Sequence, residues 1–222
     1  MSKETWTAVE HYYGSLLAPD DAALEFALQS SEAAGLPRIQ VSALQGKLLH
    51  LLARMVSARN ILEIGTLAGY STIWMARALP DDGRLITLEA NEKHADLARE
   101  NFARAGVAAK VELRLGRALD TLPQIAAEGR GPFDLIFVDA NRSNLPEYFD
   151  WSLRLARRGS VIMVDNVVRE GAVLNAESGD ADIQGIRRFA ELVAGERRVS
   201  STVIQSVGSK NYDGFAVILV IE

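Results

Sequence analysis

The 222-residue chain lacks cysteine altogether and has only three histidines. Without cysteine, disulfides, thiolate zinc sites and cysteine nucleophiles are all excluded. His11, His50 and His94 are widely spaced and match no metal-ligand motif, so we expect them to have packing or surface roles. Chemistry that depends on cysteine thiols or on clustered imidazoles is therefore not expected.

An excess of positive charge and a long apolar run are also missing. The formal net charge is −5, whereas a nucleic-acid surface usually shows a basic face, so we expect no nucleic-acid partner. The N-terminal residues contain no signal-peptide core, and the apolar run at 215–221 is too short to cross a bilayer. These features predict a soluble, cytoplasmic protein that does not enter a membrane.

The composition, with 48% hydrophobic and 24% charged residues, is that of an ordinary globular protein. This length supports one sizeable core, so we predict one domain over 1–222. Residues 1–58 should form N-terminal helices, including DDAALEFALQSSEAAG at 20–35 and SALQGKLLHLLARMV at 42–56, where apolar residues have helical spacing. Residues 59–222 should form an α/β core.

Strand and helix patterns alternate through this core. Short apolar runs predict strands at 61–64, 84–89, 110–115, 133–138, 160–165, 199–205 and 214–221. Helical patterns separate the first six strands, at 71–79, 91–106, 117–128, 145–157 and 182–194. Such alternation predicts a Rossmann-like α/β fold, with a mainly parallel seven-stranded sheet and helices on both faces. The last two strands lack an intervening helix and should form an antiparallel edge pair. Ligands are expected at the carboxyl ends of the strands.

The segment ILEIGTLAGYST ends the first strand in a glycine turn. Its spacing is Glu-x-Gly-x-x-x-Gly from Glu63 to Gly69, rather than the Gly-x-Gly-x-x-Gly that binds a dinucleotide pyrophosphate. A carboxylate inside the motif would repel a pyrophosphate and favours a cationic or zwitterionic ligand. The next strand ends in Glu89, where an acidic side chain can bind ribose hydroxyls. S-adenosylmethionine combines a ribose, an amino group and a sulfonium without phosphate.

Two later apolar strands end in hard oxygen ligands, in DLIFVDANRSN and SVIMVDN. These strand ends and the glycine turn lie in three segments that resemble a known family, the cation-dependent O-methyltransferases of the caffeoyl-coenzyme A and catechol type, particularly its small bacterial members. The segments are ILEIGTLAGYSTIWMARALPDDGRLITLEANEKHADLARENFARAG, FDLIFVDA and VIMVDNVVREG. The resemblance extends over roughly residues 36 to 221.

This resemblance implies roles for individual residues. The implied contacts to S-adenosylmethionine are Val41, Glu63, Gly65, Thr66, Ser71, Glu89 on the ribose, Ala118 on the adenine, Asp139 and Asn141. The implied metal ligands are Asp139, Asp165 and Asn166, whose hard oxygens suit Mg²⁺ first, or Mn²⁺ or Ca²⁺. The alternative is that the two aspartates only cap the segments that follow them.

The implied activity is methyl transfer to a hydroxyl of a catechol-like or other vicinal-diol phenol. A phenol loses its proton only near pH ~10, and a chelated divalent ion would stabilise the oxyanion and hold it in line with the methyl group. The resemblance also implies a homodimer. A non-catalytic or weakly active S-adenosylmethionine-binding protein is an alternative, and a nucleic-acid methyltransferase is a weaker one.

The chain departs from the family at the proposed catalytic position. The family usually reads Asp-Ala-Asp-Lys, with the lysine as proton acceptor, whereas this chain reads Asp139-Ala140-Asn141-Arg142. Arginine stays protonated, so Arg142 cannot act as a general base, although it could stabilise a phenolate. Either the metal and solvent handle the proton, which we favour, or the substrates are more acidic phenols, or activity is weak.

The acceptor side is poorly defined by sequence. The loops after Asn166 and around 206–214 should border the strand ends, which makes Arg169, Lys210 and Tyr212 candidates for acceptor contacts. The tryptophans are expected to pack helices rather than to contact substrate: Trp6, Trp74 and Trp151.

Overall fold

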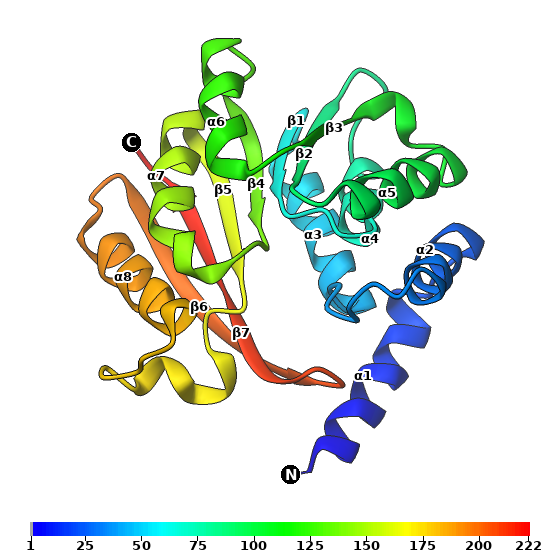
Figure 1. The fold of residues 1–222 in the computed structure, drawn as a ribbon, viewed down its shortest axis with the longest axis horizontal. Coiled ribbons are helices and arrows are strands. Elements are labelled where there is room, and N and C mark those ends of the chain that lie inside the picture. Colours follow the sequence, from blue (N-terminus) through cyan, green and yellow to red (C-terminus); the bar gives the residue numbers. More distant parts are fainter. Residues whose placement is uncertain (1) are drawn as a thin grey trace.

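The computed structural model describes residues 2–222 and contains a seven-stranded sheet with helices on both faces (Figure 1). The strands are β1 (Asn60–Ile64), β2 (Arg84–Glu89), β3 (Val111–Leu115), β4 (Phe133–Val138), β5 (Ala156–Asp165), β6 (Val199–Gly208) and β7 (Asn211–Val220). Their order across the sheet is β3-β2-β1-β4-β5-β7-β6. The first five are parallel, and β7 runs antiparallel to both β5 and β6. The predicted fold class is confirmed.

Several of the helices begin at residues whose side chains cap them. They are α1 (Lys3–Leu17), α2 (Ala22–Ala33), α3 (Ala43–Met55), α4 (Tyr70–Ala76), α5 (Glu92–Arg104), α6 (Ala118–Ala127), α7 (Leu145–Leu155) and α8 (Ala181–Gly195), with short 3-10 turns η1 (Ala108–Lys110), η2 (Arg142–Asn144) and η3 (Arg169–Leu174). Asp21 caps α2, and Ser42 with Gln45 forms a capping box on α3. Within residues 2–222, no helix combines the length and apolar character needed to cross a bilayer.

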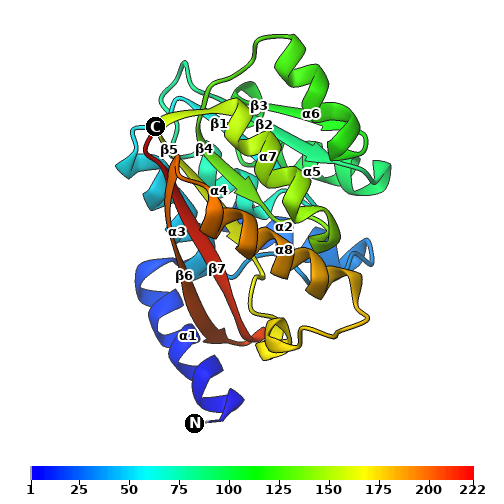
Figure 2. The ribbon, with the colours of Figure 1, turned by 90° about the vertical axis from the view of Figure 1, so that its left-hand side faces the viewer.

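The core lies in two layers, one on each face of the sheet. In β1, Ile61 packs with α3, α4 and α5, whereas Leu62 and Ile64 pack with the layer that contains α6, α7 and α8. Strands buried on both faces read as continuous apolar runs, which is why the sequence revealed them. Helix α1 lies outside both layers and runs beside β6 (Figure 2).

The structure differs from prediction at the boundaries of several elements. The predicted helix at 145–157 ends at Leu155, and β5 begins at once, earlier than the predicted start at residue 160. The charged residues Arg157 and Arg158 disguise the first half of this strand, and a register shift between Phe133 and Leu135 accommodates it. Helix α4 ends at Ala76 rather than at residue 79, and the turns at 169–174 were not predicted.

Glycine 185 should be essential to the packing of α8 on η2. A Cβ there would lie 2.2 Å from the backbone oxygen of Arg142, whereas a Cβ at Gly195 in the same helix meets nothing within 4 Å. We expect Gly185→Ala to lower the free energy of unfolding by about 1–3 kcal/mol, the usual cost of overpacking. Gly195→Ala, the control, should leave it unchanged or raise it. Urea unfolding measures the free energy of unfolding of both variants. Equal values for Gly185→Ala and Gly195→Ala would contradict this packing.

Candidate functional site

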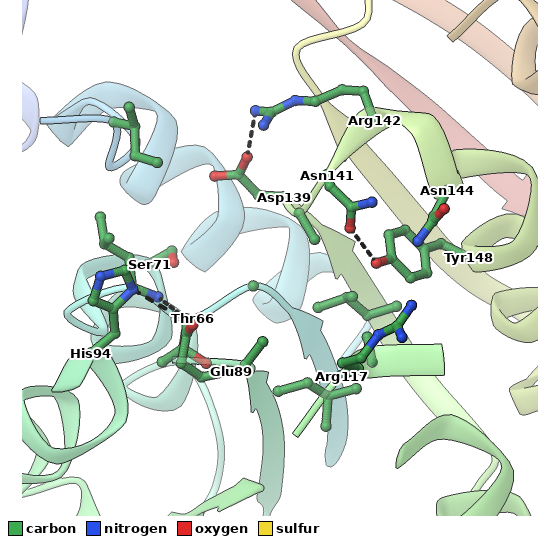
Figure 3. Close-up of a pocket in the computed structure, with 18 of the residues that line it drawn as sticks. Thr66, Ser71, Glu89, His94, Arg117, Asp139, Asn141, Arg142, Asn144 and Tyr148 are labelled. Carbon is green, nitrogen blue, oxygen red and sulfur yellow. Dashed lines mark hydrogen bonds and ion pairs between the residues drawn. The ribbon is translucent and has the colours of Figure 1, made fainter. Parts of the chain in front are cut away.

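A cavity of about 580 Å³ lies at the carboxyl ends of β1, β2 and β4 (Figure 3). We call it the first cavity. Its wall includes every predicted cofactor residue except Glu63: Val41, Gly65, Thr66, Ser71, Glu89, Ala118, Asp139 and Asn141. Arg142 also lines it, together with three residues that the sequence did not predict for a binding site: His94, Arg117 and Tyr148. The cavity is therefore formed by strand ends and by the loops that follow them.

Two glycines shape the turn at the floor of this cavity. Gly65 has φ +104°, and a Cβ there would lie 2.1 Å from the backbone oxygen of Asp139. Gly69 has φ +82°, and a Cβ there would lie 2.3 Å from Cε1 of Phe102. Only glycine satisfies both the backbone angle and the contact at these positions.

Glu63 lies beneath the turn rather than in the cavity wall. Its fully buried carboxylate accepts hydrogen bonds from Ser71 Oγ at 2.6 Å, from Thr87 Oγ1 at 2.7 Å and from the Thr72 hydroxyl. Thr66 extends the network, because its hydroxyl lies 2.6 Å from that of Thr87. Burial raises the pKa of Glu63 to about 7 despite these donors. Glu63 thus ties β1, β2 and the start of α4 together.

Glu89 is held at the cavity wall by backbone amides. Its Oε2 accepts a hydrogen bond from the amide of Leu67 at 2.8 Å, and its Oε1 accepts one from Asn91 at 2.9 Å. Nδ1 of His94 lies 3.5 Å from Oε1 (Figure 3). The carboxylate therefore has a fixed position from which its remaining lone pairs can reach a ligand. The expectation of a packing or surface role for His94 did not anticipate its place in this wall.

A second cavity of about 820 Å³ adjoins the first. It is enclosed by α1, the loop between α2 and α3, the end of β5 and the β6–β7 hairpin, and it shares with the first cavity the residues Ile39, Gln40, Val41 and Arg142. Of the three candidates for acceptor contacts, Arg169 and Lys210 line this cavity and Tyr212 does not. The Tyr212 hydroxyl instead donates to Gln205.

The tryptophans behave in different ways. Trp74 is 6% exposed and belongs to the core, and Trp151 packs against the core, as expected. Trp6 lines the second cavity, a position that the sequence did not predict. The position of Trp6 depends on α1 docking beside β6, for which local sequence gives no signal.

The predicted metal ligands converge where the two cavities meet. Asp139 lines the first cavity, Asp165 and Asn166 line the second, and Arg142 lines both. Nη2 of Arg142 donates to Oδ1 of Asp139 at 3.1 Å and also to Oδ1 of Asn166 (Figure 3 shows the pair with Asp139). Asn166 has φ +59°, and its amide donates to Asp165 Oδ1 at 2.9 Å. We call these four residues the acidic junction.

The charges of the acidic junction are poorly balanced. Burial, followed by the charge of Asp139, raises the pKa of Asp165 to about 7, and burial also raises the pKa of Asp139. Partial desolvation lowers the pKa of Lys210, which reaches the junction from the β6–β7 hairpin. A further cation placed between the two carboxylates would reduce their mutual repulsion.

The donor set fits a hard divalent cation. No group of three His, Cys, Asp or Glu side chains suited to a metal occurs within residues 2–222, so the predicted site depends on the amide oxygen of Asn166 beside Asp139 and Asp165. Two carboxylates and an amide are ligands that Mg²⁺, Mn²⁺ and Ca²⁺ accept, with water or substrate completing the shell. The unbalanced charge of the junction favours such an ion.

Known proteins share this fold over the full chain. An O-methyltransferase from *Bacillus cereus*, solved in complex with SAH, is 57% identical with a TM-score of 0.97, covering 99% of this chain and 100% of that one. The O-methyltransferase TomG from *Streptomyces achromogenes*, solved with SAM, is 53% identical with a TM-score of 0.97, covering 100% of both chains. The fold is therefore the Rossmann-like fold of S-adenosylmethionine-dependent methyltransferases.

The sequence comparisons narrow this class. The family model described as O-methyltransferase matches residues 19–217. A catechol O-methyltransferase from *Niastella koreensis* is 51% identical over 220 residues, which cover 99% of this chain and 100% of the relative. The chain belongs to the O-methyltransferase family, and it is an enzyme of that family.

The buried carboxylate of Glu63 should make stability depend on pH. Its pKa is raised from an ordinary value of 4.5 to about 7, so the folded state favours the protonated form. Stability from this group is greatest below about pH 4.5 and is lost as the pH rises to about 7, by about 3 kcal/mol at most. Glu63→Gln should flatten the fall in unfolding free energy between pH 5 and 8.

Urea unfolding at several pH values tests this prediction. Asp165 contributes a slope of the same sign, so the comparison of interest is the difference between Glu63→Gln and the native chain. The exposed Glu191→Gln, on α8, is the control and should retain the native slope. A Glu63→Gln chain that keeps the full native slope would show that Glu63 is ionised in the folded state.

Proposed function

We propose that this O-methyltransferase transfers the methyl group of S-adenosylmethionine to a hydroxyl of a catechol-like or other vicinal-diol phenol, with a divalent ion, Mg²⁺ first, held by Asp139, Asp165 and Asn166. One observation carries the proposal: the two cavities meet at these oxygen donors. A donor in the first cavity and an acceptor in the second would face each other there.

The first cavity is the proposed site of S-adenosylmethionine. Glu89 is the proposed ribose ligand, because its carboxylate is already oriented by two backbone amides. Gly65 permits close approach to the turn, and Glu63 supports that turn from below. The other proposed contacts are Val41, Thr66, Ser71, Ala118, Asp139 and Asn141. Two similar structures, those from *B. cereus* and *S. achromogenes*, hold SAH or SAM, which supports this assignment.

The acidic junction is the proposed reaction centre. A bound divalent ion would supply the positive charge that makes a phenolic oxygen a better nucleophile at neutral pH. Asp139, Asp165 and Asn166 would hold that ion and so orient the acceptor. Arg142 would add a fixed positive charge beside the oxyanion but cannot accept its proton. The proton is therefore proposed to pass to solvent through the second cavity.

The second cavity suits a flat aromatic acceptor. Trp6, Tyr13 and Leu44 contribute aromatic and apolar surface, and Arg169 and Lys210 contribute charge near the acidic junction. Aromatic walls with a few converging polar groups are typical of sites for small molecules. A catechol ring would lie among these side chains with its two hydroxyls toward Asp165 and Asn166.

The proposed oligomer is a homodimer. Helix α1 buries none of its residues, and its exposed apolar side chains include Tyr12, Leu16 and Leu17. A second copy of the chain would cover such a surface. A cytoplasmic location and one domain over 1–222 likewise stay predictions from the sequence.

Loss of the Glu89 carboxylate should weaken binding of S-adenosylmethionine. We expect Glu89→Ala to cost about 1–3 kcal/mol of binding free energy, because a charged hydrogen-bond acceptor is removed. Calorimetric titration measures this, with the exposed Glu100→Ala on the neighbouring helix as the control. Unchanged affinity in Glu89→Ala would remove Glu89 from the cofactor site.

Methyl transfer should require a divalent ion. In an assay over a panel of phenols, chelator should abolish transfer to vicinal diols, and Mg²⁺ or Mn²⁺ should restore it. Asp139→Ala should abolish transfer without restoration by either ion. The control is Asp150→Ala, which removes an exposed carboxylate from α7 and should leave transfer unchanged. Full activity in chelator would sink the metal-dependent mechanism.

A further inference from the structure

The guanidinium of Arg142 lies among the proposed ion ligands. One nitrogen, Nη2, donates both to Oδ1 of Asp139 at 3.1 Å and to Oδ1 of Asn166. We propose that Arg142 is a tethered counter-ion that occupies the acidic junction until a divalent cation displaces it, so that this arginine sets the affinity of the chain for the cation. The inference rests on the ligand set of the proposed function.

The charge of the junction explains why a cation is held there. Asp165 is 5% exposed, and the side chains of Asp139 and Arg142 are each 18% exposed, so water screens these groups poorly. Two buried carboxylates without a counter-charge repel each other and lose hydration. One guanidinium offsets one of the two negative charges, whereas a divalent ion would offset both.

The guanidinium and a divalent ion would compete for the same oxygens. A Ca²⁺ or Mg²⁺ ion lies about 2.0–2.6 Å from each oxygen that binds it. With Nη2 already shared between Oδ1 of Asp139 and Oδ1 of Asn166, the two positive centres would stand in near contact. Mutual repulsion at that distance makes simultaneous occupation unfavourable, so the arginine must move when the ion binds.

The backbone of Arg142 is closely packed. Gly185 of α8 is so close that a Cβ would lie 2.2 Å from the Arg142 carbonyl oxygen, and the amide of Ser143 donates to Asp182 Oδ1 at 2.9 Å. We therefore expect displacement to occur by rotation of the side chain. Nε of Arg142 is buried and has no hydrogen-bond partner within residues 2–222. Because a buried donor without a partner costs free energy, this side-chain conformation is one that Arg142 can leave when an ion binds.

The experiment measures ion affinity directly, without methyl transfer. Mn²⁺ is titrated calorimetrically into the full chain, comparing the native protein with Arg142→Ala and with Arg188→Ala, an exposed arginine whose guanidinium lies beside the same turn. Removal of the competitor should tighten Mn²⁺ binding by about tenfold or more, because the native junction is open to the ion for only a fraction of the time. Arg188→Ala should match the native affinity.

Stability and rescue provide independent readouts. Without Mn²⁺, Arg142→Ala should melt at a lower temperature than the native chain, because the junction has lost its counter-charge, and saturating Mn²⁺ should remove that deficit. Methylguanidinium at millimolar concentration should raise the melting temperature of ion-free Arg142→Ala and weaken its Mn²⁺ binding. It should change neither property of the native chain, where Arg142 already occupies the junction.

The outcomes separate this inference from the proposed function. If native and Arg142→Ala chains bind Mn²⁺ equally, or if the variant binds it more weakly, while Asp139→Ala abolishes binding, the counter-ion role is overturned and the ion site stands. If neither chain binds Mn²⁺, the ion site fails and the inference with it. Binding by Arg142→Ala alone would support displacement in its strongest form and would count against an ion requirement in the native enzyme.

Discussion

The contact between Gly65 and the backbone of Asp139 determines where the rest of the site lies. Because a side chain at Gly65 would collide with the Asp139 carbonyl oxygen, only glycine lets the ends of β1 and β4 approach so closely. That approach brings Asp139 into the wall of the first cavity. The parallel pairing of Val138 with Val164 then places Asp165 beside it. One glycine thus links the turn after β1 to the acidic junction.

The same edge of the sheet concentrates buried negative charge. Glu63, Asp139 and Asp165 all have raised pKa values, with burial as the largest cause in each case. Hydroxyl groups stabilise Glu63, whereas Arg142 contacts Asp139. The fold therefore gives up stability at this edge of the sheet. Carboxylates with raised pKa values are typical of functional sites. Stability is recovered in the two apolar layers, away from the strand ends.

Sequence reasoning succeeded where a local pattern determines position. Asp139 and Asp165 could be placed together because both follow apolar strands whose carboxyl ends share one edge. It was less informative for Glu63, because alternation along β1 directs this side chain to the layer of Ile61, beneath the turn. The second cavity could not be predicted, since it depends on α1 meeting the distant β6–β7 hairpin, where Glu10 accepts a hydrogen bond from the Ser209 amide at 2.7 Å.

The segment Ile39–Val41 lines both cavities and therefore limits how the specificity of this enzyme can change. Under the proposed assignment of donor and acceptor to the two cavities, a substitution there would alter the surroundings of both, so a change that favours a new acceptor would also disturb the methyl donor. Helix α1 and the β6–β7 hairpin border the second cavity alone, at Trp6 and Asn211 for example. Under the same assignment, new acceptors would be accommodated by variation in helix α1 and in the β6–β7 hairpin, while the linker between α2 and α3 would remain constrained by the methyl donor.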